Sequence, residues 1–445
     1  MSKDNPTLRY FDAEMRYLRE AGKEFAQAFP DRAAQLNLDK PGAQDPYVER
    51  LFEGFAFLMG RLREKLDDDL PELTEGLVSL LWPHYLRTIP SLAIVELMPD
   101  ISQMKGTESI ARGFQVLSQP VGPQRTRCRY STTQDLPLQP LTLDTVRLDH
   151  KPDGRAVLRL RFLCGEMADW SRLDLAQIPL YLNADAALAS ALHQALTLKV
   201  QALYVRMPGE AERQVLEGHF KPKGFADDDR LWPKGDSAFS GYQLLLEYFT
   251  FREKFMFVTL CGLQSLSLPL GATGFELDVV LCEAWSHAFT PNEEHMRLHA
   301  VPVINLFPLD ADPLNLDPLQ NEYLLRPMRL QDGHTEIYSV DRVFGSKNSV
   351  RQDYVPFSSF RHKGGMLRDE APERYFHTRL RQGANGLHDT WLILGGEGFD
   401  NDVLLKRKSL SLRLTGTNGQ LPRKALRSTL LDTAAQSTQA GLQVR

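Results

Sequence analysis

The chain has 445 residues, of which 42% are hydrophobic, and its 52 Lys and Arg residues against 57 Asp and Glu residues give a formal net charge of −5. A chain of this length and composition can bury a large core, which excludes disorder, a collagen-like fibre and a coiled-coil rod as descriptions of the whole chain. Nucleic-acid binding usually needs a basic excess, so no nucleic-acid partner is expected. The densest basic cluster, Lys406–Lys408, is interpreted as a solvated strand end.

The sequence carries no feature of export or membrane insertion. Residues 1–6 lack the apolar segment of a signal peptide. No run approaches the roughly 18 consecutive apolar residues that a membrane helix needs. The cysteines, Cys128, Cys164, Cys261 and Cys282, form no Cys-x-x-Cys pair and are expected to be reduced thiols. We therefore expect a cytoplasmic protein without direct membrane insertion.

The first 90 residues have the periodicity of amphipathic helices. A first helix is expected to end at Pro30, and a second to begin at Asp45-Pro46, residue types that cap and open helices. The apolar positions of the first helix, spaced by three and four residues, are Leu8, Phe11, Met15, Leu18, Gly22, Phe25 and Phe29. Those of the second are Val48, Leu51, Phe55, Leu58 and Leu62, with Phe52, Met59 and Leu66 widening the stripe. Asp67–Asp69 before Pro71 indicate the N-terminus of a third helix, which ends before Pro83.

After Pro90 the pattern changes to short strands. Leu141–His150 and Arg155–Cys164 are expected to pair through a turn at Lys151–Gly154, because alternate residues of the second strand are apolar. The other strand candidates are Leu92–Met98, Phe255–Cys261, Phe275–Cys282, Ala300–Phe307, Thr335–Val343, Tyr375–Gln382, Thr390–Leu394 and Ser409–Leu414. Residues 207–240 and 308–327 are expected to be irregular, and Tyr242–Phe249 to be a short helix or strand.

Ile178–Leu182, a helix at about 184–196 and Val200–Arg206 form a strand–helix–strand unit, which usually places its two strands in parallel in one sheet. The expected fold class is α+β, with a helical N-terminal region followed by largely β, sandwich-like domains that contain this β-α-β insertion. The expected limits are 1–90 for the helical region, 91–240 for a mixed β domain, 241–430 for a mainly β domain and 431–445 for the start of a C-terminal segment.

A search for catalytic residues finds one metal-binding candidate. His295 and His299 have the spacing that can place two zinc ligands on one face of a helix. The metalloprotease pattern needs Glu directly after the first histidine, and Met296 stands there instead. Gly395–Gly398 lacks the third glycine of a dinucleotide-binding loop, and Asp227–Asp229 lacks the ligand spacing of a calcium loop. We expect no enzyme activity, metal or cofactor. The alternative hypothesis is a cytoplasmic metal-dependent hydrolase that uses His295 and His299.

The N-terminal helices carry more large apolar side chains than three short helices can bury among themselves. Two interpretations stay open: these side chains pack on the β region of the same chain, or they form a helical bundle with another chain. Phe52 and Met59 are expected on a solvated flank of the second helix. The candidate partner-binding residues are Phe11, Met15, Leu18, Phe52, Phe55, Met59 and Leu62.

Several runs of residues resemble the TssF family, also called ImpG or VasA, which are wedge subunits of the type VI secretion baseplate. In the N-terminal hundred residues, where the match is most specific, they are Tyr10–Leu18 with Glu20 and Phe25, Asp45–Leu51, Phe55–Leu58, Lys65–Asp68, Pro71–Glu75, Pro83–Arg87 and Ile89–Ser91. Further runs are Tyr242–Phe249, Glu253–Phe255, Pro302–Phe307 and Tyr338–Val340. The match spans at least Tyr10 to about Ser358. Family members usually continue past the point where this chain stops, so residues 431–445 are expected to begin a truncated segment.

The resemblance implies a structural role. Two TssF copies and one TssG would form a wedge around the VgrG hub. The wedge would carry TssK, would join TssE and the contractile sheath, and would lie in the cytoplasm at the inner face of the bacterial inner membrane. The family implies no enzymatic activity and no cofactor. Which surfaces meet TssG, TssK, TssE or VgrG is left open by the sequence.

Overall fold

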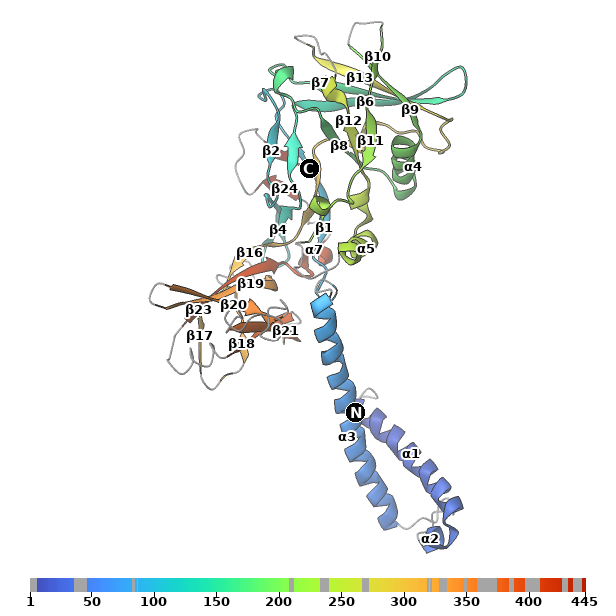
Figure 1. Cartoon of the computed structure of the whole chain (residues 1–445), viewed down its shortest axis with the longest axis vertical. Coiled ribbons are helices and arrows are strands. Elements are labelled where there is room, and N and C mark those ends of the chain that lie inside the picture. The colour runs from blue at the N-terminus through green and yellow to red at the C-terminus, as the bar shows by residue number, and fades with distance from the viewer. Residues whose placement is uncertain are drawn as a thin grey trace, which may run out of the picture. The chain divides into compact units, whose positions relative to one another are not determined.

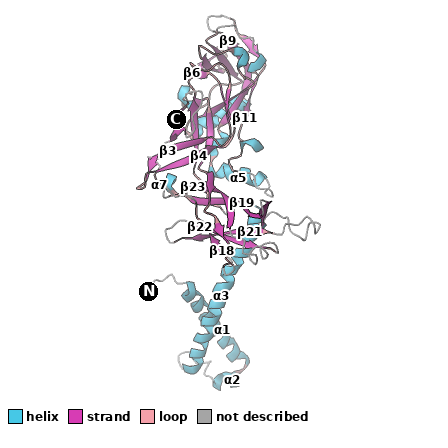
Figure 2. Cartoon of the chain, turned by 90° about the vertical axis from the view of Figure 1, so that its left-hand side faces the viewer, coloured by secondary structure: helices cyan, strands magenta, loops and turns pink. Residues whose placement is uncertain are grey.

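A computed structural model describes residues 6–35, 46–81, 85, 87–207, 212–232, 240–265, 272–317, 320, 322–327, 334–347, 350–357, 374–383, 388–396, 409–425, 431–434 and 442–445. The chain divides into two compact units, residues 1–81 and residues 82–445. Helices form the first unit, and strands predominate in the second (Figures 1 and 2). An α+β fold with a helical N-terminus and mostly β sheets is therefore confirmed.

The N-terminal unit contains α1 (Pro6–Ala28), the short α2 (Pro30–Gln35) and the long α3 (Pro46–Leu81). Pro30 does not end the helical region but opens α2, because a proline at the first helical position loses no hydrogen bond. The predicted boundary between a second and a third helix is wrong, since α3 runs through Pro71 as one helix of 36 residues. A proline inside a helix removes one backbone hydrogen bond, yet the helix continues on both sides of Pro71.

Within the described residues, the strands of the second unit form four larger sheets and one two-stranded pair. The first sheet has the order β24 (Leu431–Ala434), β3 (Gln115–Val121), β4 (Thr126–Thr132), β15 (Ala300–Ile304), β1 (Leu92–Met98), β25 (Gln443–Val444). The second has the order β10 (Gln214–Leu216), β9 (Val200–Arg206), β13 (Gly274–Leu281), β7 (Ala156–Cys164), β6 (Leu141–His150). The third has the order β11 (His219–Pro222), β12 (Phe257–Cys261), β8 (Gln177–Leu182), β14 (Met296–Arg297).

The fourth sheet has the order β16 (Phe307–Asp310), β23 (Ser409–Thr417), β19 (Glu336–Lys347), β20 (Val350–Pro356), β21 (Tyr375–Gln382), β22 (His388–Gly395), β18 (Glu322–Leu324), and β17 (Leu314–Asn315) also pairs with β23. The two-stranded pair joins β2 (Glu108–Ile110) to β5 (Leu136–Leu138). Among its described residues, this unit contains the helices α4 (Ala186–Leu198), α5 (Ser240–Thr250) and α7 (Leu421–Lys424). Short 3-10 helices lie at Trp170–Arg172, Asp227–Asp229, Arg252–Phe255, Leu263–Ser265 and Glu293–His295.

The hairpin of β6 and β7 has the predicted strands and turn. Leu148 lies opposite Leu158, and the turn closes where the Lys151 amide donates to the Arg155 carbonyl over 2.9 Å. Gly154 has a positive φ of 86°, a conformation that costs glycine little. The alternate residues Leu158, Leu160 and Phe162 are buried, and they enter a core that the second and third sheets share with α4.

The predicted β-α-β insertion is not confirmed. Its three elements exist as β8, α4 and β9, but β8 belongs to the third sheet and β9 to the second. Both strands pair antiparallel with later strands, β8 with β12 and β9 with β13. The helix therefore connects two sheets and packs into their common core, instead of returning the chain to one parallel sheet.

Strands on either side of residue 240 belong to the same sheets, as in the pairing of β1 with β15. The strands β24 and β25 also join the first sheet. The domain boundaries expected at residues 240 and 430 therefore fall within sheets and not between them. Residues 207–240 and 308–327 are not wholly irregular, because they contain the short strands β10, β11 and β16 to β18. Tyr242–Phe249 is helical, within α5.

Candidate functional site

The main candidate site of the N-terminal unit is an apolar surface on α3. Its large side chains follow each other at steps of three and four residues, so they lie along one side of the helix. Each of them is at least 50% exposed. They are Leu51, Phe55, Leu58, Leu62 and Leu66, and we call them the α3 stripe. A contiguous stripe of this kind in a folded unit is a candidate contact surface.

The neighbouring side of α3 packs against α1, and the two helices run antiparallel (Figure 1). Ala56 is fully buried there, and a Cβ added to Gly60 would lie 3.1 Å from the backbone nitrogen of Phe11. Small residues at these two positions let the helix backbones approach closely. Arg63 forms an ion pair with Glu14 over 2.7 Å across the same contact.

This packing changes the interpretation of the predicted partner-binding residues. Phe52 and Met59 are half-buried, and the Phe52 ring faces Gly22 of α1. The expectation that these two lie on a solvated flank is therefore wrong. They share a side of α3 with the small residues Ala56 and Gly60, and this side packs against α1. Met15 is buried and Phe11 and Leu18 are half-buried, whereas Phe55 and Leu62 are exposed.

Additional aromatic surface lies at the far end of α1. Phe25 and Phe29 are both exposed, and their ring centroids are 5.2 Å apart. The Arg32 guanidinium lies 5.9 Å from the Phe29 ring centroid, a cation–π contact. The sequence-based expectation of more apolar side chains than the helices can bury is confirmed.

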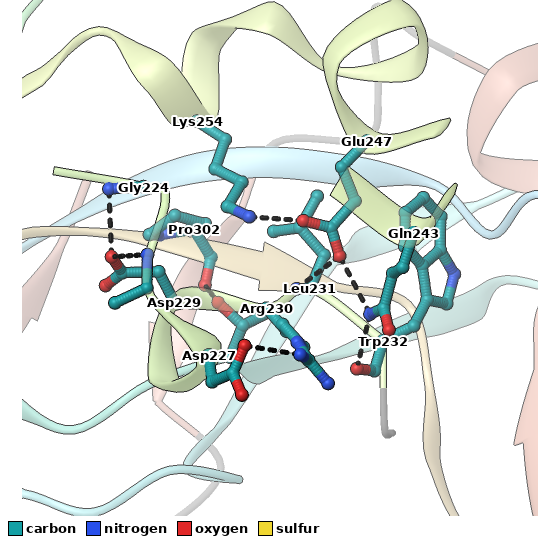
Figure 3. Close-up of polar contacts among 12 residues, drawn as sticks. Gly224, Asp227, Asp229, Arg230, Leu231, Trp232, Gln243, Glu247, Lys254 and Pro302 are labelled. Atoms are coloured by element: carbon teal, nitrogen blue, oxygen red, sulfur yellow. Dashed lines mark hydrogen bonds and ion pairs between the residues drawn. The ribbon is translucent and has the colours of Figure 1, made fainter. Parts of the chain in front are cut away.

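In the second unit, a buried ion pair joins Glu247 of α5 to Lys254, and both side chains are 1% exposed (Figure 3). The same carboxylate accepts hydrogen bonds of 3.0 Å from the backbone amide of Leu231 and from Nε2 of Gln243. Gln243 Nε2 also donates to the Trp232 carbonyl over 3.0 Å. Hydrogen bonds offset the desolvation of a buried charge, so this network fixes α5 against the segment 231–232.

The structure does not arrange His295 and His299 as a pair of helix ligands. His295 ends a 3-10 helix, and its Nδ1 accepts the Asn292 amide over 3.1 Å. His299 lies beyond β14, is buried, and its Nε2 accepts the Gln139 amide over 3.2 Å. Burial lowers the pKa of His299 to about 4. Within the part of the chain that the structure describes, no three His, Cys, Asp or Glu side chains form a group that could hold a metal ion.

The acidic segment Asp227–Asp229 serves the local backbone and, within the described residues, is not part of a group that could hold a metal ion. Asp227–Asp229 forms a 3-10 helix in which Asp229 accepts the amides of Gly224 and Ala226, so it acts as a local cap. Of the Gly395–Gly398 segment, residues 397 and 398 lie outside the described residues. No helix in the described ranges combines the length and hydropathy of a membrane span.

An accessible stripe of apolar side chains at helical spacing is typical of proteins that assemble with other chains. Comparison with known proteins gives the family. The chain belongs to the TssF family of the type VI secretion system, whose family model matches residues 3–445. The resemblance seen in the sequence is thus confirmed.

One curated relative is the type VI secretion system component TssF1 of Pseudomonas aeruginosa, which is 33% identical over 396 residues. This match covers 84% of the chain, and the chain spans 63% of the relative's length. A solved TssK-TssF-TssG baseplate subcomplex contains a chain with 60% identity and a TM-score of 0.80, covering 89% of this chain and 73% of that one. A solved baseplate complex of the type VI secretion system contains a chain with 58% identity and a TM-score of 0.63. The match covers 99% of this chain and 75% of that one.

Proposed function

We propose that this chain is a structural subunit of the type VI secretion baseplate. In this proposal it forms a wedge with a second copy and with TssG around the VgrG hub. The wedge carries TssK and joins TssE and the contractile sheath. The assembly would lie at the cytoplasmic face of the inner membrane. The high identity to a chain of a TssK-TssF-TssG subcomplex supports TssG and TssK as partners. The family match and this identity carry the baseplate role, and the exposed α3 stripe carries the assignment of the TssG contact.

The α3 stripe has the chemistry of a helix–helix contact. Its residues repeat at steps of three and four, and knobs at that spacing fit the holes of a second helix. Full burial of one Leu or Phe side chain stabilises a contact by about 1.5–3 kcal/mol, so several such residues can hold a partner. We assign direct contact with TssG to Phe55 and Leu62. Phe11, Met15, Leu18, Phe52 and Met59 are assigned a positioning role, because they lie at or near the α1–α3 contact.

The test replaces one stripe residue by a charged residue. Phe55→Glu should leave the isolated fold intact, because the side chain is exposed. In the complex the carboxylate would be buried without a partner, at a cost of several kcal/mol, on the order of 3 or more. We expect the variant to keep its circular dichroism spectrum and melting temperature and to lose co-purification with TssG.

A matched control is Leu198→Glu, which places the same charge at an exposed leucine at the end of α4. It should co-purify with TssG as the unchanged chain does. Normal co-purification of Phe55→Glu would overturn the assignment of the stripe. Failure of the unchanged chain to bind TssG would overturn the baseplate role.

We propose no catalytic activity and no cofactor. The alternative of a metal-dependent hydrolase needs His295 and His299 to share one metal ion, and their nitrogens instead accept backbone amides. Elemental analysis of the purified chain tests this proposal. About one zinc ion per chain, lost in His295→Ala, would revive the hydrolase hypothesis.

A further inference from the structure

Helix α5 buries two polar residues and exposes its aromatic residues. Gln243 and Glu247, one turn apart, are buried at 2% or less exposure. On the other side Tyr242, Leu245 and Phe249 follow each other at steps of three and four, and Phe249 is 80% exposed. A surface helix normally buries its apolar stripe and exposes its polar face. The orientation of α5 is the reverse of that rule.

The buried network explains why α5 keeps this orientation. Glu247 receives the Leu231 amide, the Gln243 side chain and the Lys254 ammonium, all of which are inside the fold (Figure 3). Rotating α5 to bury its aromatic side would leave those groups without hydrogen-bond partners. Buried polar groups without partners lower the stability of the fold. Leu246 adds apolar contact on the inner side through the cluster of Leu231 and Trp232. The apolar side is therefore held outward by specific contacts.

The outward side is a small, ordered apolar surface. The Tyr248 ring packs edge-on against buried Phe255, with centroids 5.5 Å apart, and Phe225 packs on the same Phe255 at 5.0 Å. These contacts anchor the surface on the core. We define the α5 face as Tyr242, Leu245, Tyr248 and Phe249.

A positive charge borders the α5 face. The Arg252 guanidinium lies 5.6 Å from the Tyr248 ring centroid and is exposed. Among the described residues it forms no ion pair with a carboxylate. The neighbouring Lys254 does not add to this charge, because its ammonium is buried against Glu247. Among the described residues, a ligand that covers the face therefore meets apolar surface bordered by the Arg252 guanidinium.

We propose that the α5 face is a second docking surface, which receives an amphipathic helix of a partner protein with a carboxylate beside its apolar seam. Two turns of side chains at steps of three and four fit the groove of another helix. The carboxylate pairs with Arg252, whose planar guanidinium can accept it in bidentate geometry. The inference rests on the proposed baseplate role only for the choice of partner chains to test.

The test uses the full chain co-purified with TssG and TssK. A photoreactive benzoylphenylalanine replaces Phe249 in one preparation and Leu198, exposed on α4, in the control. Illumination and peptide mass spectrometry then identify the crosslinked segment. We expect position 249 to crosslink to a helical segment of TssG or TssK that contains Asp or Glu, at a yield at least tenfold above position 198.

Charge variants make the test specific. Arg252→Glu should reduce the crosslink at least tenfold, and changing the facing carboxylate of the partner to Lys should restore it. Arg252→Lys keeps the charge without the planar fork and should give an intermediate yield. Circular dichroism checks that each variant folds.

Each other result overturns the proposal in a distinguishable way. No crosslink above the control, in a complex that still co-purifies, overturns the docking surface and leaves the baseplate role standing. A crosslink to a second copy of this chain, or to a segment without a carboxylate, overturns the assigned occupant. If the unchanged chain binds neither TssG nor TssK, the proposed function fails together with this inference.

Discussion

Asn305 and Asn418 form a reciprocal pair of hydrogen bonds at the connection between the first and the fourth sheet. Asn305 Nδ2 donates to Asn418 Oδ1 over 2.8 Å, and the backbone N–H of Asn418 donates to Asn305 Oδ1 over 2.7 Å. Asn305 Nδ2 also donates to the Arg129 carbonyl, and Thr417 Oγ1 donates to Asn305 Oδ1. The buried amide of Asn305 thus uses both donors and both lone pairs.

Asn305→Asp should destabilise the second unit. The carboxylate offers no donor to the Arg129 carbonyl or to Asn418 Oδ1, and it would be buried. A loss of about 2–4 kcal/mol is expected, because unsatisfied buried polar groups cost more than a hydrogen bond gains. Thermal melting measures it. Asn315→Asp, the same change at an exposed position, is the control and should leave the melting temperature unchanged.

Two glycines of α3 should respond oppositely to alanine. A Cβ at Gly54 meets nothing within 4 Å, so Gly54→Ala should stabilise the N-terminal unit by about 0.5–1 kcal/mol through helix propensity. A Cβ at Gly60 would lie 3.1–3.3 Å from the α1 backbone. Gly60→Ala should therefore lower the stability of the helix pair, since backbone cannot move aside as a side chain can. Chemical denaturation followed by circular dichroism compares the two, and equal effects would contradict the close packing.

His299 should make stability fall as the pH falls. Its pKa is about 4 in the folded chain because it is buried, against about 6.5 when unfolded. Between these values the unfolded state binds more protons, so stability is fully present above pH 6.5 and is lost progressively toward pH 4. The loss attributable to this group is on the order of 3 kcal/mol at pH 4. Between pH 7.5 and 4, the melting temperature should fall more steeply for the unchanged chain than for His299→Gln. An equal pH dependence of the two melting temperatures would count against this role of His299.

The Glu247–Lys254 pair should show strong coupling. Lys254→Met leaves a buried carboxylate with its hydrogen bonds but without its counter-ion, which should cost about 3–5 kcal/mol. The double variant Glu247→Gln with Lys254→Met removes both charges and keeps the hydrogen-bonding shape of residue 247. It should be more stable than Lys254→Met alone, as a double-mutant cycle of melting curves would show. Additive losses would mean that the two charges do not interact.

The sequence predicts local elements well where one periodicity dominates. Leu158, Leu160 and Phe162 alternate into the core as expected, and the helical steps of α1 and α3 are present in the structure. The side of α3 that faces α1 was not predictable from large apolar residues. Ala56 and Gly60 decide it, because close helix packing favours small side chains that carry little hydrophobic pattern.

Long-range contacts explain the other differences. The separation of β8 from β9 depends on their antiparallel partners β12 and β13, which lie far along the chain. The orientation of α5 depends on Glu247 meeting Leu231 and Lys254, so its aromatic residues give a misleading indication of its inner side. Nothing in the spacing of Tyr242–Phe249 distinguishes an inner from an outer stripe.

The pairing of β1 with β25 has a consequence for the order in which the protein matures during translation. Leu97 lies opposite Val444, and the Glu96 and Arg445 backbones exchange two hydrogen bonds of 2.9 Å. This edge of the first sheet can close only after residues 443–445 have left the ribosome. The contacts between α1 and α3 lie within the first 81 residues and can form much earlier. A nascent chain would therefore offer its α3 stripe to a partner while its sheets are still incomplete.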